Sequence, residues 1–115
     1  MADAAATKSI DKFSKALSAF QLGTTHEVPA PLVQTFLAVA RNEGKTVNEL
    51  VELTNGNRST VSRHLLDLSE NLRNGAPGYG LLNRVRNPTD LRSVMFVLSP
   101  KGKNYLTQMR DIMEA

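Results

Sequence analysis

Cysteine is absent from this chain of 115 residues. A chain without cysteine has no disulfide framework, no reactive thiol and no thiolate metal site. The sequence also lacks any apolar run approaching the roughly 18 residues that a membrane-spanning helix requires. Its first residues are rich in alanine but contain no apolar core of a secretory signal, so we expect a cytoplasmic protein without a membrane partner.

Histidine is scarce as well, which bears on catalysis. His26 falls in an expected linker and His64 in an expected helix, and there is no third histidine. No metal-spaced pair, nucleophile elbow or phosphate-binding loop accompanies them. The glycines between 75 and 80 lack the strand–helix context of a dinucleotide site. We therefore expect no enzyme, metal or cofactor. No residue indicates a pocket for a small-molecule effector, so the effector stays unknown.

The composition is ordinary for one globular domain, with 41% hydrophobic and 22% charged residues, and we expect a single domain over 1–115. The charge, net +3, is uneven along the chain. Residues 57–92 contain 6 basic and 3 acidic side chains, against 5 and 6 in residues 1–56. Every basic residue of 57–92 is an arginine. Because a guanidinium suits planar contact with phosphates and base edges, this segment indicates an anionic partner.

The stretch from Asn57 to Leu68 predicts a helix with two different faces. Gly56 interrupts the preceding element, and the Asn57 side chain can cap the first turn. Val61, Leu65 and Leu68 recur at helical spacing and are expected to face the core. The polar residues at its start are Arg58, Ser59, Thr60, Ser62 and Arg63.

Two arginines at a helix start oppose the helix dipole, so they cost stability unless an anion lies close. The first turn of such a helix fits the major groove of duplex DNA, where arginine reads guanine. The alternative is a solvated polar face on a core helix.

Periodicity and turn signals predict the other elements. We expect helices over 8–22, 31–42, 47–53, 57–72 and 99–114, a tight turn at 54–56, and strands over 81–85 and 94–98 joined by a turn at 87–90. Residues 1–7 are expected to fray, and the glycine-rich residues 73–80 to form a loop. Thr46 and Glu49 form a capping-box pattern. The expected inward residues of the second and third helices are Leu32, Phe36, Val39, Ala40, Val47, Leu50, Val51 and Leu53.

Two helices joined by a short glycine-containing turn are typical of a helix-turn-helix, and a hairpin after it forms a wing. The fold class is therefore predicted to be α+β and mostly α. A winged helix-turn-helix over 29–98 would be flanked by N- and C-terminal helices that mediate dimerisation. We expect Arg84, Arg86 and Arg92 at the tip of the wing, where they would reach the minor groove or the DNA backbone.

The ordered set of motifs resembles the MarR family of winged-helix transcriptional regulators. The matching segments are 57–63 (NRSTVSR), 87–92 (NPTDLR) and 97–102 (VLSPKG), and the resemblance covers roughly residues 28–106. It implies a homodimer on a pseudo-palindromic operator, with Arg92 in the minor groove and Asp90 supporting the wing. It also implies base or phosphate contacts from Ser59, Thr60, Ser62 and Arg63, and a phosphate contact from Thr46.

The chain departs from the family pattern in two places: the segment 73–80 is longer, and few residues follow Met113, so the wing and the dimer are expected to differ from those of other members.

An apolar stripe on each terminal helix indicates the dimer interface. Its residues are Ile10, Phe13, Leu17 and Phe20 on the first helix and Leu106, Met109, Ile112 and Met113 on the last. The alternative is that the stripe covers the chain's own core.

Together these patterns predict a homodimer that binds double-stranded DNA sequence-specifically and acts as a transcriptional repressor. The predicted DNA contacts are Thr46, Asn57, Arg58, Ser59, Thr60, Ser62, Arg63, Arg84, Arg86 and Arg92. The alternative is a winged helix that binds proteins, or that binds DNA architecturally without operator specificity. RNA is a weaker alternative because the deep groove of A-form RNA does not admit the helix.

Overall fold

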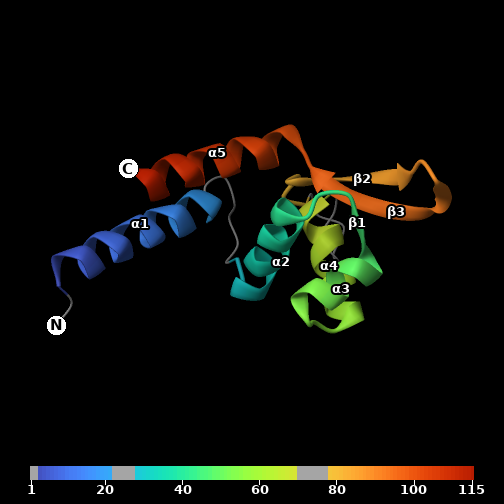
Figure 1. The fold of residues 1–115 in the computed structure, drawn as a ribbon, viewed down its shortest axis with the longest axis horizontal. Helices are drawn as coiled ribbons and strands as arrows, with labels where there is room; N and C mark the ends of the chain where they lie inside the picture. Colours follow the sequence, from blue (N-terminus) through green and yellow to red (C-terminus); the bar gives the residue numbers. More distant parts are fainter. Residues whose placement is uncertain (1–2, 22–27, 70–77) are drawn as a thin grey trace. The chain divides into compact units, whose positions relative to one another are not determined.

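The computed structural model describes residues 3–21, 28–69 and 78–115 (Figure 1). The helices are α1 (Ala4–Gln21), α2 (Ala30–Arg41), α3 (Val47–Thr54), α4 (Arg58–Ser69) and α5 (Pro100–Glu114). The strands are β1 (Lys45–Thr46), β2 (Leu82–Asn87) and β3 (Asp90–Leu98), which form an antiparallel sheet in the order β1-β3-β2. The predicted fold class, mostly helical with a winged helix-turn-helix, is confirmed.

The chain divides into two compact units, and the boundary falls within α5. Residues 28–102 form the first, which contains α2 to α4 and the sheet, and residues 1–27 with 103–115 form the second. Each unit has its own packing.

The core of the 28–102 unit is formed by the inward faces of α2, α3 and α4 against the sheet. Val61, Leu65 and Leu68 of α4 are buried as the helical spacing predicted. The other large apolar side chains of this core are Leu32, Phe36, Val39, Leu50, Leu81, Leu82, Phe96 and Leu98. Because three helices and a sheet share these residues, the start of α4 and the hairpin β2–β3 are held by one core (Figure 1).

The expectation that Leu53 faces inward was wrong, since 53% of this residue is exposed. Helix α3 has only eight residues, and Leu50 is its single fully buried position. Thr54 lies four residues after Leu50, on the same side, and its hydroxyl donates to the Leu50 carbonyl at 2.8 Å. A helix of eight residues makes only about two turns, so its buried side is narrow; it holds Leu50 and the half-buried Thr54, while Leu53 faces solvent.

The hairpin is longer than predicted. Strand β2 extends to Asn87 and β3 begins at Asp90, so only Pro88 and Thr89 form the turn. Side chains hold this turn closed, because the Asn87 carboxamide oxygen accepts hydrogen bonds from the backbone N–H and the hydroxyl of Thr89. The two-residue strand β1 was not predicted because so short a run has no readable alternation.

In the other unit, α1 begins at Ala4, so the expectation that the chain frays up to Thr7 was wrong. The Asp3 carboxylate accepts a hydrogen bond from the Ala6 backbone N–H at 2.8 Å and caps the first turn, and alanine favours the helix. The predicted end of this helix near Gly23 lies outside the described residues. So do the predicted end of α4 at Leu72 and most of the predicted loop 73–80.

Helix α1 packs along the C-terminal part of α5 in the same unit. The rings of Phe20 and Tyr105 meet edge to face with centroids 4.9 Å apart, and the Tyr105 hydroxyl donates to the Ala16 carbonyl. Phe20 is only 5% exposed, so it belongs to this intramolecular contact. The other apolar residues of the α1 stripe, Ile10, Phe13 and Leu17, stay exposed.

Residues 99–102 fix the start of α5 against residues 80–81. The buried Ser99 hydroxyl donates to the Gly80 carbonyl at 2.6 Å and accepts from the Gly102 backbone N–H at 3.0 Å. A Cβ atom on Gly102 would lie 2.2 Å from the Leu81 carbonyl oxygen, a backbone atom that cannot move away independently. Only glycine allows α5 to lie this close to residues 80–81.

We therefore expect Gly102→Ala to lower the free energy of unfolding by about 1–3 kcal/mol, as overpacking of a filled site does. The measurement is the urea unfolding curve followed by circular dichroism. Lys103→Ala is the matched control, because this exposed neighbour lies on the same helix. An unchanged midpoint for Gly102→Ala would contradict the close approach of α5 to Leu81.

Candidate nucleic-acid interface

The cap predicted at Asn57 is present at the start of α4. Its side-chain oxygen accepts hydrogen bonds from the backbone N–H groups of Ser59 and Thr60 at 2.9 and 3.3 Å, and from the Ser59 hydroxyl at 2.9 Å. These bonds satisfy N–H groups that a helix start leaves unpaired. They also occupy the Asn57 oxygen, so the side-chain NH2 group is the part of Asn57 that remains for a partner.

The turn before α4 has little freedom. Asn55 ends α3 in the left-handed conformation, with φ of 53°. A Cβ atom on Gly56 would lie 2.9 Å from a methyl group of Val61, so the backbone passes close to the α4 core face. Helices α3 and α4 are thereby fixed against each other as a helix-turn-helix.

The predicted capping box at the start of α3 is also present. The Thr46 hydroxyl accepts from the Glu49 backbone N–H at 3.3 Å, and the Glu49 carboxylate accepts from the Thr46 backbone N–H at 3.1 Å. The hydrogen bond from the Thr46 backbone is the main cause that lowers the pKa of Glu49, and Lys45 adds a smaller effect. The Thr46 hydroxyl hydrogen remains available to donate.

The arginines of the basic segment meet few carboxylates. Five of them lie in the described residues: Arg58, Arg63, Arg84, Arg86 and Arg92. Arg58 donates to the side-chain oxygen of Asn48, a neutral group at the start of α3. Within the described part of the chain, Arg63 and Arg84 make no ion pair or side-chain hydrogen bond.

The hairpin arginines differ in position, and the expectation that all three lie at its tip was wrong for Arg84. Arg84 pairs with Phe96 in the middle of the sheet, because the strands are longer than predicted. Arg86 pairs with Val94, and its guanidinium donates to the Leu91 carbonyl at 2.7 Å. Arg92 lies nearest the turn, and 95% of its side chain is accessible.

The tip of the hairpin contains a β-bulge. Regular pairing runs up to Arg86 with Val94 and resumes with Asn87 and Asp90. Three residues of β3, namely 91–93, therefore have no counterpart on β2. Two side chains bond the backbone of this bulge: Asp90 accepts from the Arg92 N–H at 3.1 Å, and Arg86 donates to the Leu91 carbonyl.

Asp90 makes further contacts at the bulge. One carboxylate oxygen lies 3.5 Å from the Arg92 Nε, and the other accepts from the Ser93 hydroxyl at 3.5 Å. An ion pair this exposed contributes little to stability. The hydrogen bond from the Arg92 N–H to Asp90 holds the backbone of Arg92, while the guanidinium stays in solvent.

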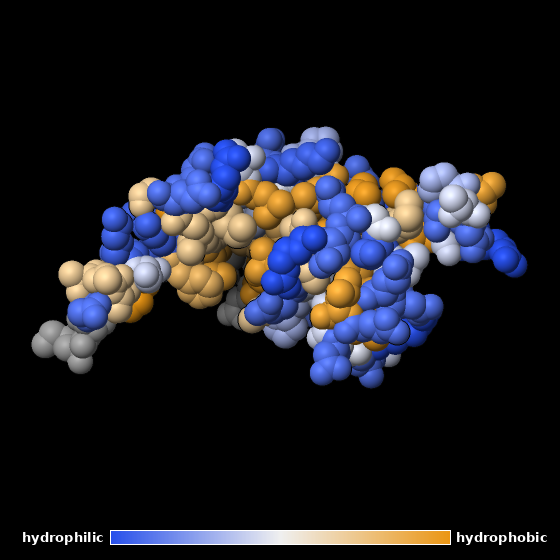
Figure 2. Space-filling view, in the orientation of Figure 1, coloured by the Kyte–Doolittle hydropathy of each residue, from blue (hydrophilic) through white to orange (hydrophobic). Residues whose placement is uncertain are grey.

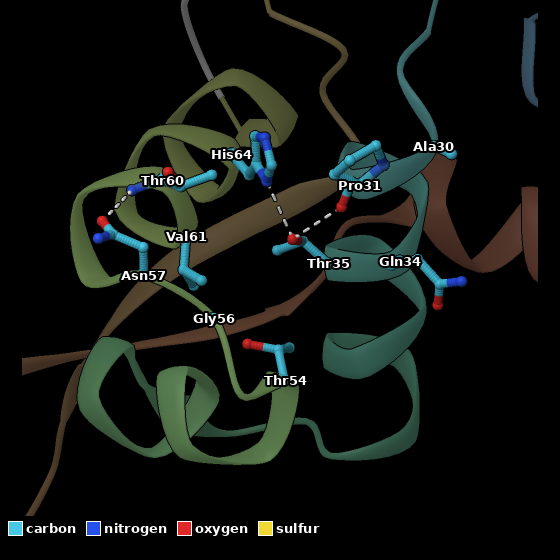
Figure 3. A pocket seen from close by; sticks show the side chains of 10 residues that line it. All are labelled: Ala30, Pro31, Gln34, Thr35, Thr54, Gly56, Asn57, Thr60, Val61 and His64. Carbon is cyan, nitrogen blue, oxygen red and sulfur yellow. Dashed lines mark hydrogen bonds between the residues drawn. The ribbon is translucent and has the colours of Figure 1, made fainter.

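Away from the arginines, His64 of α4 bonds to Thr35 of α2 (Figure 3). The Thr35 hydroxyl donates its one hydrogen to the Pro31 carbonyl at 3.1 Å, so it must accept from His64 Nδ1, also at 3.1 Å. Burial is the main cause that lowers the pKa of His64, Asp67 opposes it, and Arg63 adds to it. The neutral imidazole is therefore the form that the fold favours.

The same residues line an open hollow of about 350 Å³ between α2 and the start of α4 (Figure 3). Thr35 and His64 lie at its wall together with Asn57 and Thr60. The sequence indicated no pocket, because these side chains come from segments about thirty residues apart and only the fold brings them together. None of them forms a recognisable motif alone.

Other kinds of site are not found in the described ranges. Residues 3–21, 28–69 and 78–115 contain no cluster of three or more histidine, cysteine or acidic side chains that would hold a metal ion. In those same ranges no helix combines the length and apolarity needed to cross a bilayer.

Because the pKa of His64 is lowered in the folded chain, the unfolded chain binds the proton more tightly, and stability falls as the pH drops through 6.5. We expect the urea midpoint of the wild type to decrease between pH 7.5 and 5.5. His64→Gln should show a smaller decrease, since glutamine does not titrate. Equal decreases in the two proteins would contradict the burial of the imidazole against Thr35.

No protein-family model matches this sequence, and no curated protein matches it. Solved structures do match. They include wild-type MarR from E. coli in its apo form (TM-score 0.64, 18% identity, 94% of this chain and 68% of that chain). Two more are the transcriptional regulator Tm0710 from Thermotoga maritima (0.68, 19%, 94% and 66%) and the transcriptional repressor CouR bound to a 23-mer DNA duplex (0.58, 21%, 92% and 70%). This chain spans about two thirds of the length of each, and it has the winged-helix fold of the MarR regulators.

Proposed function

We propose that this protein is a MarR-family transcriptional regulator that binds double-stranded DNA as a homodimer and represses transcription. The observation that carries the proposal is the state of its arginines. Of the five described in 57–92, only Arg92 lies beside a carboxylate, and its side chain is 95% exposed. Positive charge that the protein leaves unneutralised favours a polyanionic partner, and duplex DNA presents one phosphate about every 1.7 Å.

Helix α4 is the proposed reader of the major groove. Thr60 and Ser59 are exposed at its capped first turn, and Arg63 lies one turn further along. We assign Arg63 to a guanine edge, because a guanidinium without another partner can bond O6 and N7 together. Ser62, which is half-buried, is assigned to a phosphate or base contact beside it.

The start of α3 is the proposed phosphate anchor. The Thr46 hydroxyl accepts within the capping box and keeps its hydrogen for a phosphate oxygen. Arg58 joins this end of the site, since it reaches from α4 to Asn48 on α3. Helix N-termini favour anions, so two of them side by side suit a DNA backbone.

The hairpin is the proposed wing. Arg92 is assigned to the minor groove and Asp90 to holding the backbone that presents it. Arg84 and Arg86 lie two residues apart on one face of β2 and are assigned to phosphates. Arg86 already uses one N–H on the Leu91 carbonyl, but a guanidinium has five.

Dimerisation is proposed through the terminal helices. Ile10 and Phe13 are 59% and 60% exposed, and Leu17 and Met113 are also exposed. Leu106, Met109 and Ile112 of α5 are half-buried in the single chain. A stripe of large apolar side chains on a helix of 18 residues indicates a partner surface. The likeness to CouR, solved with a DNA duplex, supports the DNA partner.

The experiment that tests the proposal is selection of bound sequences from a random pool of duplex DNA. An enriched inverted repeat would support both specific reading and the dimer. An enriched sequence without symmetry would contradict binding as a symmetric dimer. Enrichment of nothing, with binding retained, would favour an architectural role, and absence of binding would favour a protein partner.

For α4, we expect Arg63→Ala to weaken binding to the selected duplex about 5- to 150-fold, and to relax the preference at one base pair, as loss of a bidentate contact does. The measurement is a gel shift with the selected duplex and with single-base variants of it. Arg110→Ala is the control, because it removes the same charge from α5, where Arg110 pairs with Asp111. Equal affinities for Arg63→Ala and wild type would exclude this role.

For the dimer, we expect wild-type protein to elute with the mass of a dimer in size exclusion with light scattering. Phe13→Glu should give a monomer, since a carboxylate cannot be buried unpaired in an apolar interface. Lys15→Glu is the control on an exposed position of the same helix outside the stripe. A wild-type monomer at micromolar concentration would reject the interface.

A further inference from the structure

The most exposed large apolar side chain among the described residues is Leu91, at the bulge of the wing. Of this residue, 64% is accessible. Hydrophobic surface appears at the far end of the hairpin beside hydrophilic surface (Figure 2). Leu91 adds nothing to the core of the 28–102 unit. Single exposed leucines are common, so exposure alone does not decide its role.

The backbone at Leu91 is held in place by other side chains. Arg86 donates to its carbonyl at 2.7 Å, and Asp90, directly before it, accepts from the Arg92 N–H at 3.1 Å. These bonds satisfy two backbone groups of the three unpaired residues, the Leu91 carbonyl and the Arg92 N–H. A bulge fixed on both sides presents a side chain in a defined direction. The Arg86 side chain therefore positions the backbone of Leu91.

Leu91 also lies directly before Arg92, whose guanidinium is in solvent. If the wing enters a minor groove, as the proposed function requires, Arg92 cannot enter without bringing its neighbour to the groove. The groove walls are deoxyribose C–H groups, and its floor is smooth at A·T pairs but carries the guanine amino group at G·C pairs. Leucine is among the apolar side chains that proteins place in minor grooves.

We propose that Leu91 is a specificity-determining residue that packs in the DNA minor groove and disfavours G·C pairs there, and that Arg86 is its positioning residue. This inference rests on the proposed DNA binding. It assigns to the wing an apolar contact in addition to the charge of Arg92. Its ligand is the groove itself, so it can be probed with duplexes of simple repeating sequence before any operator is known.

The test uses three fluorescent duplexes with alternating A·T, I·C or G·C pairs and the full-length protein. Inosine lacks the guanine amino group, so I·C resembles G·C in the major groove and A·T in the minor groove. We expect the wild type to bind A·T and I·C duplexes more tightly than G·C. Leu91→Ala should lose about fivefold on A·T and I·C and little on G·C, as partial loss of a buried leucine predicts.

Controls separate this effect from unfolding and from charge. Leu53→Ala removes a leucine from α3 that is 53% exposed, against 64% for Leu91, and should bind as wild type does. Leu91→Met, which keeps the apolar volume, should retain the preference, whereas Leu91→Asn should lose it. The salt dependence of binding should be the same for wild type and Leu91→Ala, because no charge is removed.

The positioning role has its own matched pair. Arg84→Met and Arg86→Met each remove one charge from the same face of β2, so both should reduce the salt slope alike. Only Arg86→Met should reduce the discrimination between I·C and G·C, since Arg84 makes no bond to the bulge. Equal discrimination in the two variants would overturn the role of Arg86.

Each of the other outcomes would contradict the role of Leu91. If Leu91→Ala behaves as Leu53→Ala on all three duplexes, Leu91 has no DNA contact, and the proposed function stands without it. If it weakens all three duplexes equally, the contact is outside the groove floor and the specificity claim fails. If Leu91→Ala changes the oligomeric mass, a second copy of the chain covers Leu91 and the inference is wrong. If wild type binds no duplex at low salt, both proposals fail.

Discussion

The described arginines of residues 57–92 are the constraint on which this structure depends, because the described part of the chain places only one carboxylate, that of Asp90, within ion-pair distance of them. Arg58 bonds an amide and Arg86 a carbonyl, and both acceptors are neutral. Arg92 has a carboxylate neighbour but remains in solvent. A guanidinium that bonds neutral oxygen keeps its full charge, so these contacts set the direction of the side chain and leave its electrostatic potential to act on a partner.

Short polar side chains give this charged surface its order. Asn57 caps α4, Thr46 and Glu49 cap α3, and Asp90 bonds the bulge of the wing. In each case a side-chain oxygen satisfies backbone N–H groups that secondary structure leaves free at that point. The groups assigned to DNA therefore stand on backbone that is fixed before any partner binds, which lowers the entropy lost on binding.

Much of the fold was predictable because local chemistry determines it. The caps at Asn57 and Thr46 depend on residues close to them in the sequence. So does the helical spacing of Val61, Leu65 and Leu68. Other features depend on contacts between distant segments. Phe20 was placed on the outer stripe of α1, but Tyr105 covers it, and no pattern within α1 reveals a partner 85 positions later.

The tip of the wing also depends on contacts that the sequence does not reveal. Arg84, Arg86 and Arg92 look alike in the sequence, yet their positions differ. Arg84 lies in mid-strand, Arg86 donates to the Leu91 carbonyl, and Arg92 lies beside Asp90 with its side chain in solvent. The difference follows from strands that are longer than predicted and from a bulge of three residues, and bulges have no reliable sequence signal in a segment this short. Leu91 drew no attention in the sequence because it fell between the predicted turn at 87–90 and the predicted strand at 94–98, and single exposed leucines are common.

The salt dependence of binding between this protein and duplex DNA tests the central claim most directly. If DNA phosphates neutralise the unmatched arginines, the logarithm of the affinity should fall with the logarithm of salt concentration. The slope should be about −3 or steeper, at about −0.9 for each phosphate contacted. A flat dependence, or no binding at low salt, would show that these guanidiniums serve another purpose.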